Sequence, residues 1–264
     1  MAYFKANLFS AHSLAGECYS NWAYDIFETS GYCPEVFDVS EPILQSWNAK
    51  DAFCEAWRQQ SSRPFGQILL QRKQAIPFYA SVVFQFGPDR KRDGKPPYHG
   101  LSLYDVDESK CIGESRKNLI DLCDRLFAEL EFDYGFLCLH DEYDAKNIIK
   151  GVSRSGGAIE PRKVVGMNWP YCLPGLYWTN YFGGRYFDQG FGEGIQALHS
   201  TEIARVGKGV RLQTSHDPRF FQSDRAEQIE RGIRDKLGSS WFFDRESDHD
   251  CNALEVSLDE LRSP

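Results

Sequence analysis

The chain has 264 residues and a formal net charge of −8, from 38 acidic and 30 basic side chains. Apolar residues make up 42% and aromatic residues 14%, which excludes a largely disordered chain and predicts a packed core. The acidic balance disfavours nucleic-acid binding, which needs a basic face to neutralise phosphates. We expect a single domain over residues 1–264, with a candidate N-terminal subdomain 1–110, a C-terminal subdomain 111–245 and an acidic tail 246–264.

The cysteine pattern indicates a reducing compartment. There are eight, without a C-x-x-C pair and without a zinc-ligand spacing. Cys123 and Cys138 stand in apolar runs, where a free cysteine behaves as a small hydrophobe, and the neighbours of Cys172 also indicate a buried, unreactive thiol. The opening residues do not resemble a signal peptide, and no apolar run reaches the ~20 residues of a membrane span. We therefore expect free thiols, a cytoplasmic location and no membrane partner.

The first half of the chain predicts one helix followed by strands. After a loop-rich start, Ser40 is a suitable N-cap for a helix that ends near Gln59, because Ser-Ser-Arg-Pro follows. β-branched and aromatic residues then predict strands. These expected strands cover residues 65–70, 78–86 and 98–104.

Two polar segments are expected to be connections. Residues 87–97 hold four basic side chains, which suit either a binding loop or, more simply, an exposed hairpin tip. Residues 151–161 contain glycine and serine and are expected to be flexible.

The second half predicts helices that alternate with strands. A clear apolar stripe predicts a helix over residues 114–131, directly followed by a buried strand over 134–139. Asp144 is a candidate cap for a brief helix that contains Ile148 and Ile149. Further elements are expected as a short helix near Tyr186 and Phe187, a strand over 209–214, a helix over 224–237 between Ser223 and Gly238, and a strand over 241–243. This order predicts an α+β fold with a mixed, largely antiparallel sheet and helices packed on it.

The segment from Pro174 to Gly184 has the most distinctive pattern. Pro174 and Gly175 mark its start, and Gly183 with Gly184 marks its end. Within it, side chains alternate between two faces: Leu176, Trp178, Asn180 and Phe182 on one, and Tyr177, Thr179 and Tyr181 on the other. Large side chains on both faces predict a central strand that is covered on both sides.

This aromatic and glycine pattern continues toward the C-terminus. A Gly-Val-Arg-Leu-Gln-Thr strand follows at residues 209–214, then a helix, and then Leu237-Gly238 leads into Trp241-Phe242-Phe243-Asp244. The pattern resembles bacterial immunity proteins of polymorphic-toxin and type VI secretion systems, in particular the immunity-protein-52-like group. The resemblance lies in the C-terminal part and includes no catalytic motif. It implies a protein that binds one cognate toxin and occludes its active site.

The richest polar cluster is the run from His140 to Asp144, which follows the strand expected over 134–139. Its acids and histidine are of the types that hold divalent cations, but adjacent strand residues point to opposite faces, so we expect no metal here. A basic toxin surface, such as a nuclease groove, would instead be matched by Asp141, Glu142 and Asp144 as mimics of phosphate. We therefore expect these three residues to bind the partner.

Two alternatives remain open. One is a hydrolase with a pocket near His140 or His216. The adjacent Ser215, His216 and Asp217 cannot form a relay, which needs groups that converge from separate segments, and no established catalytic motif is present. The other is a structural or adaptor protein of a secretion or phage-related system. Our leading expectation is a binding protein without enzymatic activity or cofactor.

Overall fold

The chain folds around one large antiparallel sheet. The computed structural model describes residues 2–85, 98–151, 160–164, 169, 172–188, 191–198 and 202–243. From edge to edge, the ten strands of the sheet are β11 (Glu202–Val206), β12 (Gly209–Gln213), β10 (Thr179–Phe182), β7 (Tyr134–Leu139), β1 (Tyr3–Ser10), β6 (His99–Asp107), β5 (Phe78–Gln85), β4 (Phe65–Arg72), β2 (Val36–Asp38) and β3 (Gln45–Ser46). A separate hairpin joins β8 (Ile148–Gly151) to β9 (Glu160–Val164).

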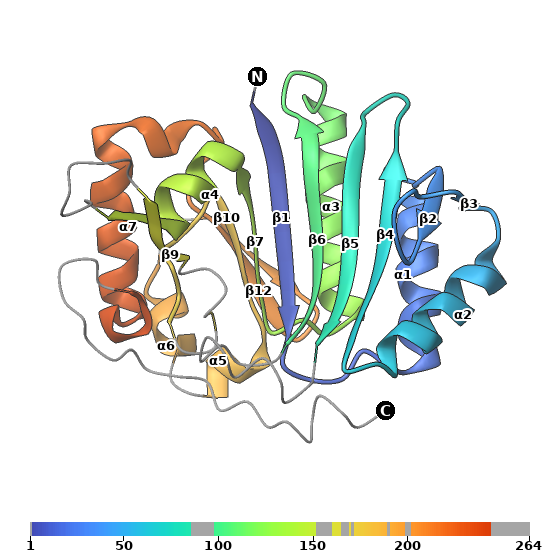
Figure 1. The fold of residues 1–264 in the computed structure, drawn as a ribbon. Coiled ribbons are helices and arrows are strands. Elements are labelled where there is room, and N and C mark those ends of the chain that lie inside the picture. Colours follow the sequence, from blue (N-terminus) through green and yellow to red (C-terminus); the bar gives the residue numbers. More distant parts are fainter. Residues whose placement is uncertain are drawn as a thin grey trace.

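Helices pack on this sheet, which confirms the predicted α+β class (Figure 1). The α-helices of the described residues are α1 (Glu17–Thr29), α2 (Lys50–Ser61), α3 (Glu114–Glu129), α4 (His140–Asn147), α5 (Gly184–Asp188), α6 (Phe191–Gln196) and α7 (Asp224–Leu237), with short 3-10 turns η3 (Phe220–Gln222) and η4 (Ser239–Trp241). Because β1 pairs with both β6 and β7, one sheet runs through the segments 1–110 and 111–245.

The two faces of the sheet are covered differently. Helices α1, α2 and α3 lie on one face, where Phe27 stacks on Phe78 and Phe127 packs against Tyr181. Helices α4 to α7 lie on the other face, over the half formed by β7, β10 and β12. No described helix covers that second face over β6, β5 and β4 (Figure 1). We call this uncovered part the open face.

Local sequence patterns predict most of the central elements. The strands expected over 65–70, 78–86 and 98–104 are β4, β5 and β6, and the helix expected over 114–131 is α3. The cap at Ser223 is also confirmed, because its Oγ accepts a hydrogen bond from the backbone N–H of Ala226 at 3.2 Å.

The N-terminal expectations were wrong in two places. The expected loop-rich start contains β1 and α1, and the helix expected from Ser40 begins only at Lys50. Asp38 explains the late start, because its carboxylate accepts hydrogen bonds from the N–H groups of Val39 and Leu44 and holds a turn there.

The expected strand from Pro174 to Gly184 is shorter than predicted. Only Thr179–Phe182 forms β10, which lies between β12 and β7 and is buried on both faces, as expected for a central strand. The cause is Asn180, whose side-chain amide accepts from the N–H of Tyr177 and donates to its carbonyl oxygen, both at 2.8 Å. The backbone of Tyr177 is thereby satisfied by a side chain and does not enter the sheet.

Other corrections concern the ends of elements. Asp144 lies inside α4 and does not cap a helix at Ile148, which belongs to strand β8. The expected strand over 241–243 is reduced to the turn η4 and one bridge between Leu173 and Phe242. The loop 87–97, the middle of 151–161 and the tail 246–264 lie outside the described residues.

The cysteine prediction was wrong at one position. Cys18, Cys33, Cys54, Cys111, Cys123 and Cys138 are free, but Cys172 is disulfide-bonded and offers no free thiol as a nucleophile. In the described part of the chain, no helix combines the length and apolar content needed to cross a membrane.

Candidate binding cleft

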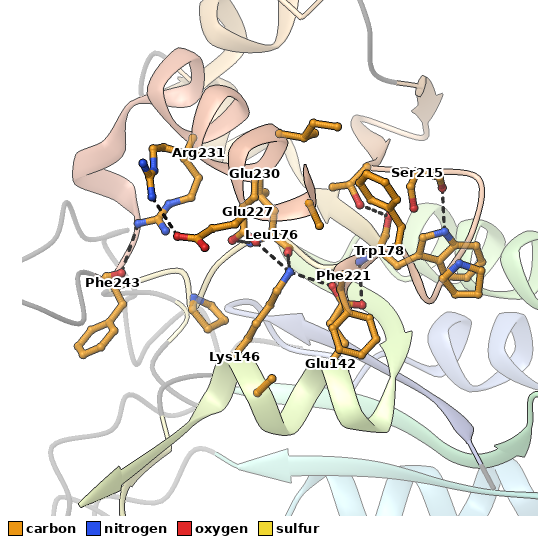
Figure 2. Close-up of a pocket in the computed structure, with 18 residues that line it drawn as sticks. Glu142, Lys146, Leu176, Trp178, Ser215, Phe221, Glu227, Glu230, Arg231 and Phe243 are labelled. Carbon is orange, nitrogen blue, oxygen red and sulfur yellow. Dashed lines mark hydrogen bonds and ion pairs between the residues drawn. The ribbon is translucent and has the colours of Figure 1, made fainter. Parts of the chain in front are cut away.

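A cleft of about 780 Å³ lies between α4 and α7 (Figure 2). Its floor is formed by α4 and the segment 174–178, and one wall by residues 214–221. It is lined by Glu142, Ala145, Lys146, Pro174, Leu176, Trp178, Thr214, Ser215, Pro218, Phe220, Phe221, Ala226, Glu227, Ile229, Glu230, Arg231, Arg234 and Phe243. The cleft thus joins the polar run after β7 to the aromatic segment before β10.

Three charged side chains form an ion network on the floor (Figure 2). The Nζ atom of Lys146 lies 2.9 Å from Oε1 of Glu142, one helical turn away, and 3.0 Å from Oε2 of Glu230 on α7. The side chain of Glu142 is 2% exposed, and those of Lys146 and Glu230 are 18% and 19% exposed. The network therefore ties α4 to α7 with little access to solvent.

The same three side chains hold the backbone of the segment 174–178. The carboxylate of Glu230 accepts from the N–H of Leu176 at 2.9 Å, and Glu142 accepts from the N–H of Trp178 at 3.2 Å. Lys146 donates to the carbonyl oxygen of Leu176. A segment that leaves the sheet would otherwise carry unpaired buried backbone groups, so the network supplies the partners that a neighbouring strand would have supplied.

Gly175 is required by this arrangement. Its φ of +142° lies in a region that L-residues rarely adopt, and a Cβ there would come within 2.8 Å of Oε1 of Glu230. The glycine that marks the start of the aromatic segment in the sequence therefore serves the close approach of Glu230.

Burial and charge act in opposite directions on the network. Burial lowers the pKa of Lys146, but Glu142 and Glu230 outweigh this effect and hold the pKa above its ordinary value. Burial raises the pKa of Glu142, and Lys146 opposes that shift. An ammonium between two carboxylates keeps its charge, so the network is a set of paired ions.

The walls of the cleft are aromatic. The indole Nε1 of Trp178 donates to the carbonyl oxygen of Ser215 at 2.8 Å, which fixes its ring against residues 214–221. At the rim, Arg231 pairs with Glu227 at 2.9 Å, and the guanidinium of Arg234 lies over the ring of Phe242. Because the charged groups that line the cleft already have partners in the protein, the cleft would recognise a ligand chiefly by shape and apolar contact.

The expected partner-binding residues separate into two groups. Asp141 is exposed, and the side chain of Asp144 is 46% exposed and lies 3.6 Å from Nε2 of His140. Glu142 was also expected to bind the partner, but it is buried. Both of its oxygens accept hydrogen bonds inside the protein, so the side chain does not reach the surface. Asp141 and Asp144 remain as an acidic edge of α4, outside the residues that line the cleft.

The histidines of the hydrolase alternative do not converge. His140 reaches Asp144 of its own helix, one turn away, and His216 is exposed in the turn after β12. The described residues place no carboxylate from a distant segment in an ion pair with either histidine. They also contain no group of three or more potential ligands that could hold a metal ion.

A different histidine, His12, lies beside a carboxylate, and no sequence motif marks this pair. His12 borders a smaller cavity of about 300 Å³, with Nδ1 3.8 Å from Asp133 and 2.9 Å from the hydroxyl of Ser10. A relay needs the hydroxyl and the carboxylate on opposite ring nitrogens, whereas here both lie at Nδ1. Asp133 lies far along the chain from Ser10 and His12, so no local sequence pattern predicts this contact.

The comparisons with known proteins identify a shared fold. No family model and no curated protein matches this sequence. The solved structure of a type VI secretion system protein of Pseudomonas aeruginosa is similar, with a TM-score of 0.61 and 9% sequence identity. The match covers 99% of this chain and 81% of that one. The similarity shows that the whole chain shares the fold of that protein.

Proposed function

We propose that this protein binds a cognate protein toxin and neutralises it by occluding the toxin's active site, as an immunity protein of a type VI secretion system. The observation that carries the proposal is the cleft between α4 and α7, which has aromatic walls and a floor of internally paired charges. Such a site suits an inserted side chain or loop of a partner, because an aromatic pocket gives contact area without leaving a charge unpaired.

The charge of the molecule supports a basic partner. The net charge of −8 attracts a cationic protein over long range, and Asp141 and Asp144 place negative charge on α4, the helix that also supplies Glu142 and Lys146 to the cleft. These two carboxylates would pair with basic residues of the toxin at the rim of the interface, while the cleft supplies the apolar centre.

The similar fold of the Pseudomonas aeruginosa protein supports the secretion context, because that protein belongs to a type VI secretion system. The resemblance of the C-terminal aromatic pattern to immunity proteins leads to the same proposal. An immunity protein acts by binding alone and uses no cofactor.

The first test is co-expression with the product of the adjacent open reading frame. The proposal expects that this product alone stops growth and that co-expression of the present chain restores it. Growth arrest that persists despite stable co-expression of both proteins would overturn the immunity function.

The second test locates the interface. The double charge reversal Asp141→Lys with Asp144→Lys should weaken toxin binding at least about tenfold and reduce its dependence on salt. The matched control is Asp121→Lys with Glu129→Lys, which changes the net charge equally on exposed positions of α3, on the opposite face of the sheet. Equal effects of the two double variants would show that only total charge matters and would remove the acidic edge of α4 from the interface.

A further inference from the structure

One ion pair joins the wall of the cleft formed by residues 214–221 to the central sheet. The guanidinium of Arg219 donates from Nε to both carboxylate oxygens of Glu108, at 3.0 and 3.1 Å, and from Nη2 to Oε2 at 2.6 Å. Glu108 directly follows β6 and lies 111 positions away along the chain. A planar guanidinium that bonds both oxygens fixes a direction as well as a distance, so the pair orients the segment that carries Arg219.

Glu108 is the fixed end of this pair. The residue is 7% exposed, its backbone N–H donates to the carbonyl oxygen of Ala2 at 3.0 Å, and its own carbonyl oxygen accepts from the N–H of the buried Cys111 at 3.1 Å. These backbone bonds hold Glu108 independently of the cleft. The side chain of Arg219, in contrast, is 60% exposed and belongs to the connection between β12 and α7. The pair therefore fastens a surface connection to a buried part of the fold.

The two ends of the wall are held in different ways. The start of the wall is fastened by Trp178 of the cleft floor, through its carbonyl oxygen and its indole N–H. The hydrogen bonds of residues 216–223 remain within residues 215–226, with one exception. That exception is the pair of Arg219 with Glu108. In the described part of the chain, this pair is thus the one polar tie between residues 216–223 and a distant segment.

The wall carries two of the aromatic rings that line the cleft. Phe220 and Phe221 immediately follow Arg219 in the turn η3, and no residue of this turn is buried (Figure 2). Phe221 packs against the edge of the core, so burial fixes these rings only in part. Because both rings move with the backbone of Arg219, the ion pair controls how far they stand from α4 and α7.

We propose that the pair of Arg219 with Glu108 sets the width of the cleft and that Arg219 is a positioning residue for toxin binding. This inference rests on the function proposed above, in which the cleft receives a side chain or loop of the toxin. A wall that is already held in its bound position loses less conformational entropy when the partner enters. Without the pair, the toxin itself has to order the wall, and affinity falls although no contact residue has changed.

Hydrogen exchange of the full chain without any partner tests the control of the wall. Arg219→Gln removes the charged fork, and we expect backbone exchange over residues 216–223 to accelerate at least about fivefold, with unchanged exchange in β10 and β12. The matched control is Arg58→Gln, which breaks the exposed ion pair of Arg58 with Glu55 inside α2 and changes the net charge equally. Exchange over residues 216–223 that is the same in both variants overturns the proposal.

Affinity for the product of the adjacent open reading frame, measured by calorimetry, tests the positioning role. Arg219→Gln and Glu108→Gln change the net charge in opposite directions, yet each should weaken binding at least about fivefold. The double variant should bind no more weakly than either single variant, because both substitutions remove the same interaction. Circular dichroism confirms that each variant is folded.

Three outcomes refute the positioning role: unchanged affinity, additive losses, or changes that follow the sign of the charge. A different result separates this inference from the proposed function. If the unmodified chain binds no toxin while exchange over residues 216–223 responds as expected, the immunity function is refuted and control of the wall by the ion pair is still supported.

Discussion

At the scale of single residues, Lys146 is the residue on which the cleft depends most. It neutralises two carboxylates and donates to the backbone of Leu176. An E-x-x-x-K spacing in the sequence indicates that Glu142 and Lys146 share a helix face. It does not indicate that this face is buried, and for that reason Glu142 was expected at the surface. Burial was decided by α7, which brings Glu230 from a distant part of the chain.

Removal of the cation should destabilise the protein strongly. The variant Lys146→Met leaves the buried carboxylate of Glu142 without its charge partner, and we expect a loss of about 3 kcal/mol in the free energy of unfolding. Urea denaturation measures this loss. The double variant Glu142→Gln with Lys146→Met removes both charges and should recover part of it. A single variant that unfolds within about 0.5 kcal/mol of the unmodified chain would show that the network contributes little.

His99 gives the protein a predicted acid sensitivity. Burial lowers the pKa of His99 to about 4, and its Nδ1 accepts from the N–H of Leu14, which requires the neutral ring. Between about pH 6.5 and 4 the unfolded chain binds a proton at this histidine and the folded chain does not, so stability falls as the pH falls through this window. The shift corresponds to about 3 kcal/mol.

The variant His99→Asn keeps an acceptor but does not titrate, so its stability should fall less steeply between pH 6.5 and 4. Thermal unfolding at several pH values measures the difference in slope. Identical slopes for the variant and the unmodified chain would assign the acid sensitivity to other groups.

At the scale of elements, side-chain hydrogen bonds decide where strands and helices end. Asp38 holds a turn where a helix was expected, and Asn180 removes Tyr177 from the strand that its alternation predicts. Hydrophobic alternation was right about the faces of β10 and wrong about its length. Alternation predicts which side chains are buried. It does not predict whether a backbone group pairs with a neighbouring strand or with a side chain, and this pairing sets the length of the strand.

The variant Asn180→Ala tests this role. It leaves the buried N–H and carbonyl groups of Tyr177 unpaired, and we expect a loss of about 2 to 4 kcal/mol in the free energy of unfolding. The control is Asn21→Ala, which removes an exposed side-chain hydrogen bond within α1 and should cost about 0.5 kcal/mol or less. Chemical denaturation of both variants makes the comparison. Similar small losses would mean that water replaces Asn180.

At the scale of the whole molecule, the described helices cover one face of the sheet broadly and the other face only in part (Figure 1). The cleft between α4 and α7 lies on the partly covered face and has aromatic walls. Under the function proposed here, the cleft and the acidic edge of α4 bind a basic toxin.

Filling the cleft should block toxin binding without disturbing the fold. Ala226 lines the cleft from α7, so Ala226→Trp should weaken toxin binding at least about tenfold. Gln228 is exposed on the same helix outside the cleft lining, and Gln228→Trp is the matched control. Isothermal titration calorimetry compares the two variants. Unchanged toxin affinity of Ala226→Trp would exclude the cleft as the binding site.

The elements that depend on near neighbours are predictable from the sequence alone. The apolar stripe of α3, the Ser223 cap of α7 and the strand propensity of β4, β5 and β6 are local properties, and the structure confirms them. In contrast, Glu142 is buried and Lys146 lies between Glu142 and Glu230 because distant segments pack together. The same packing determines which part of the second face the described helices leave uncovered. These features depend on how distant segments pack, and spacing along the chain holds no information about the space between helices that approach only in the folded protein.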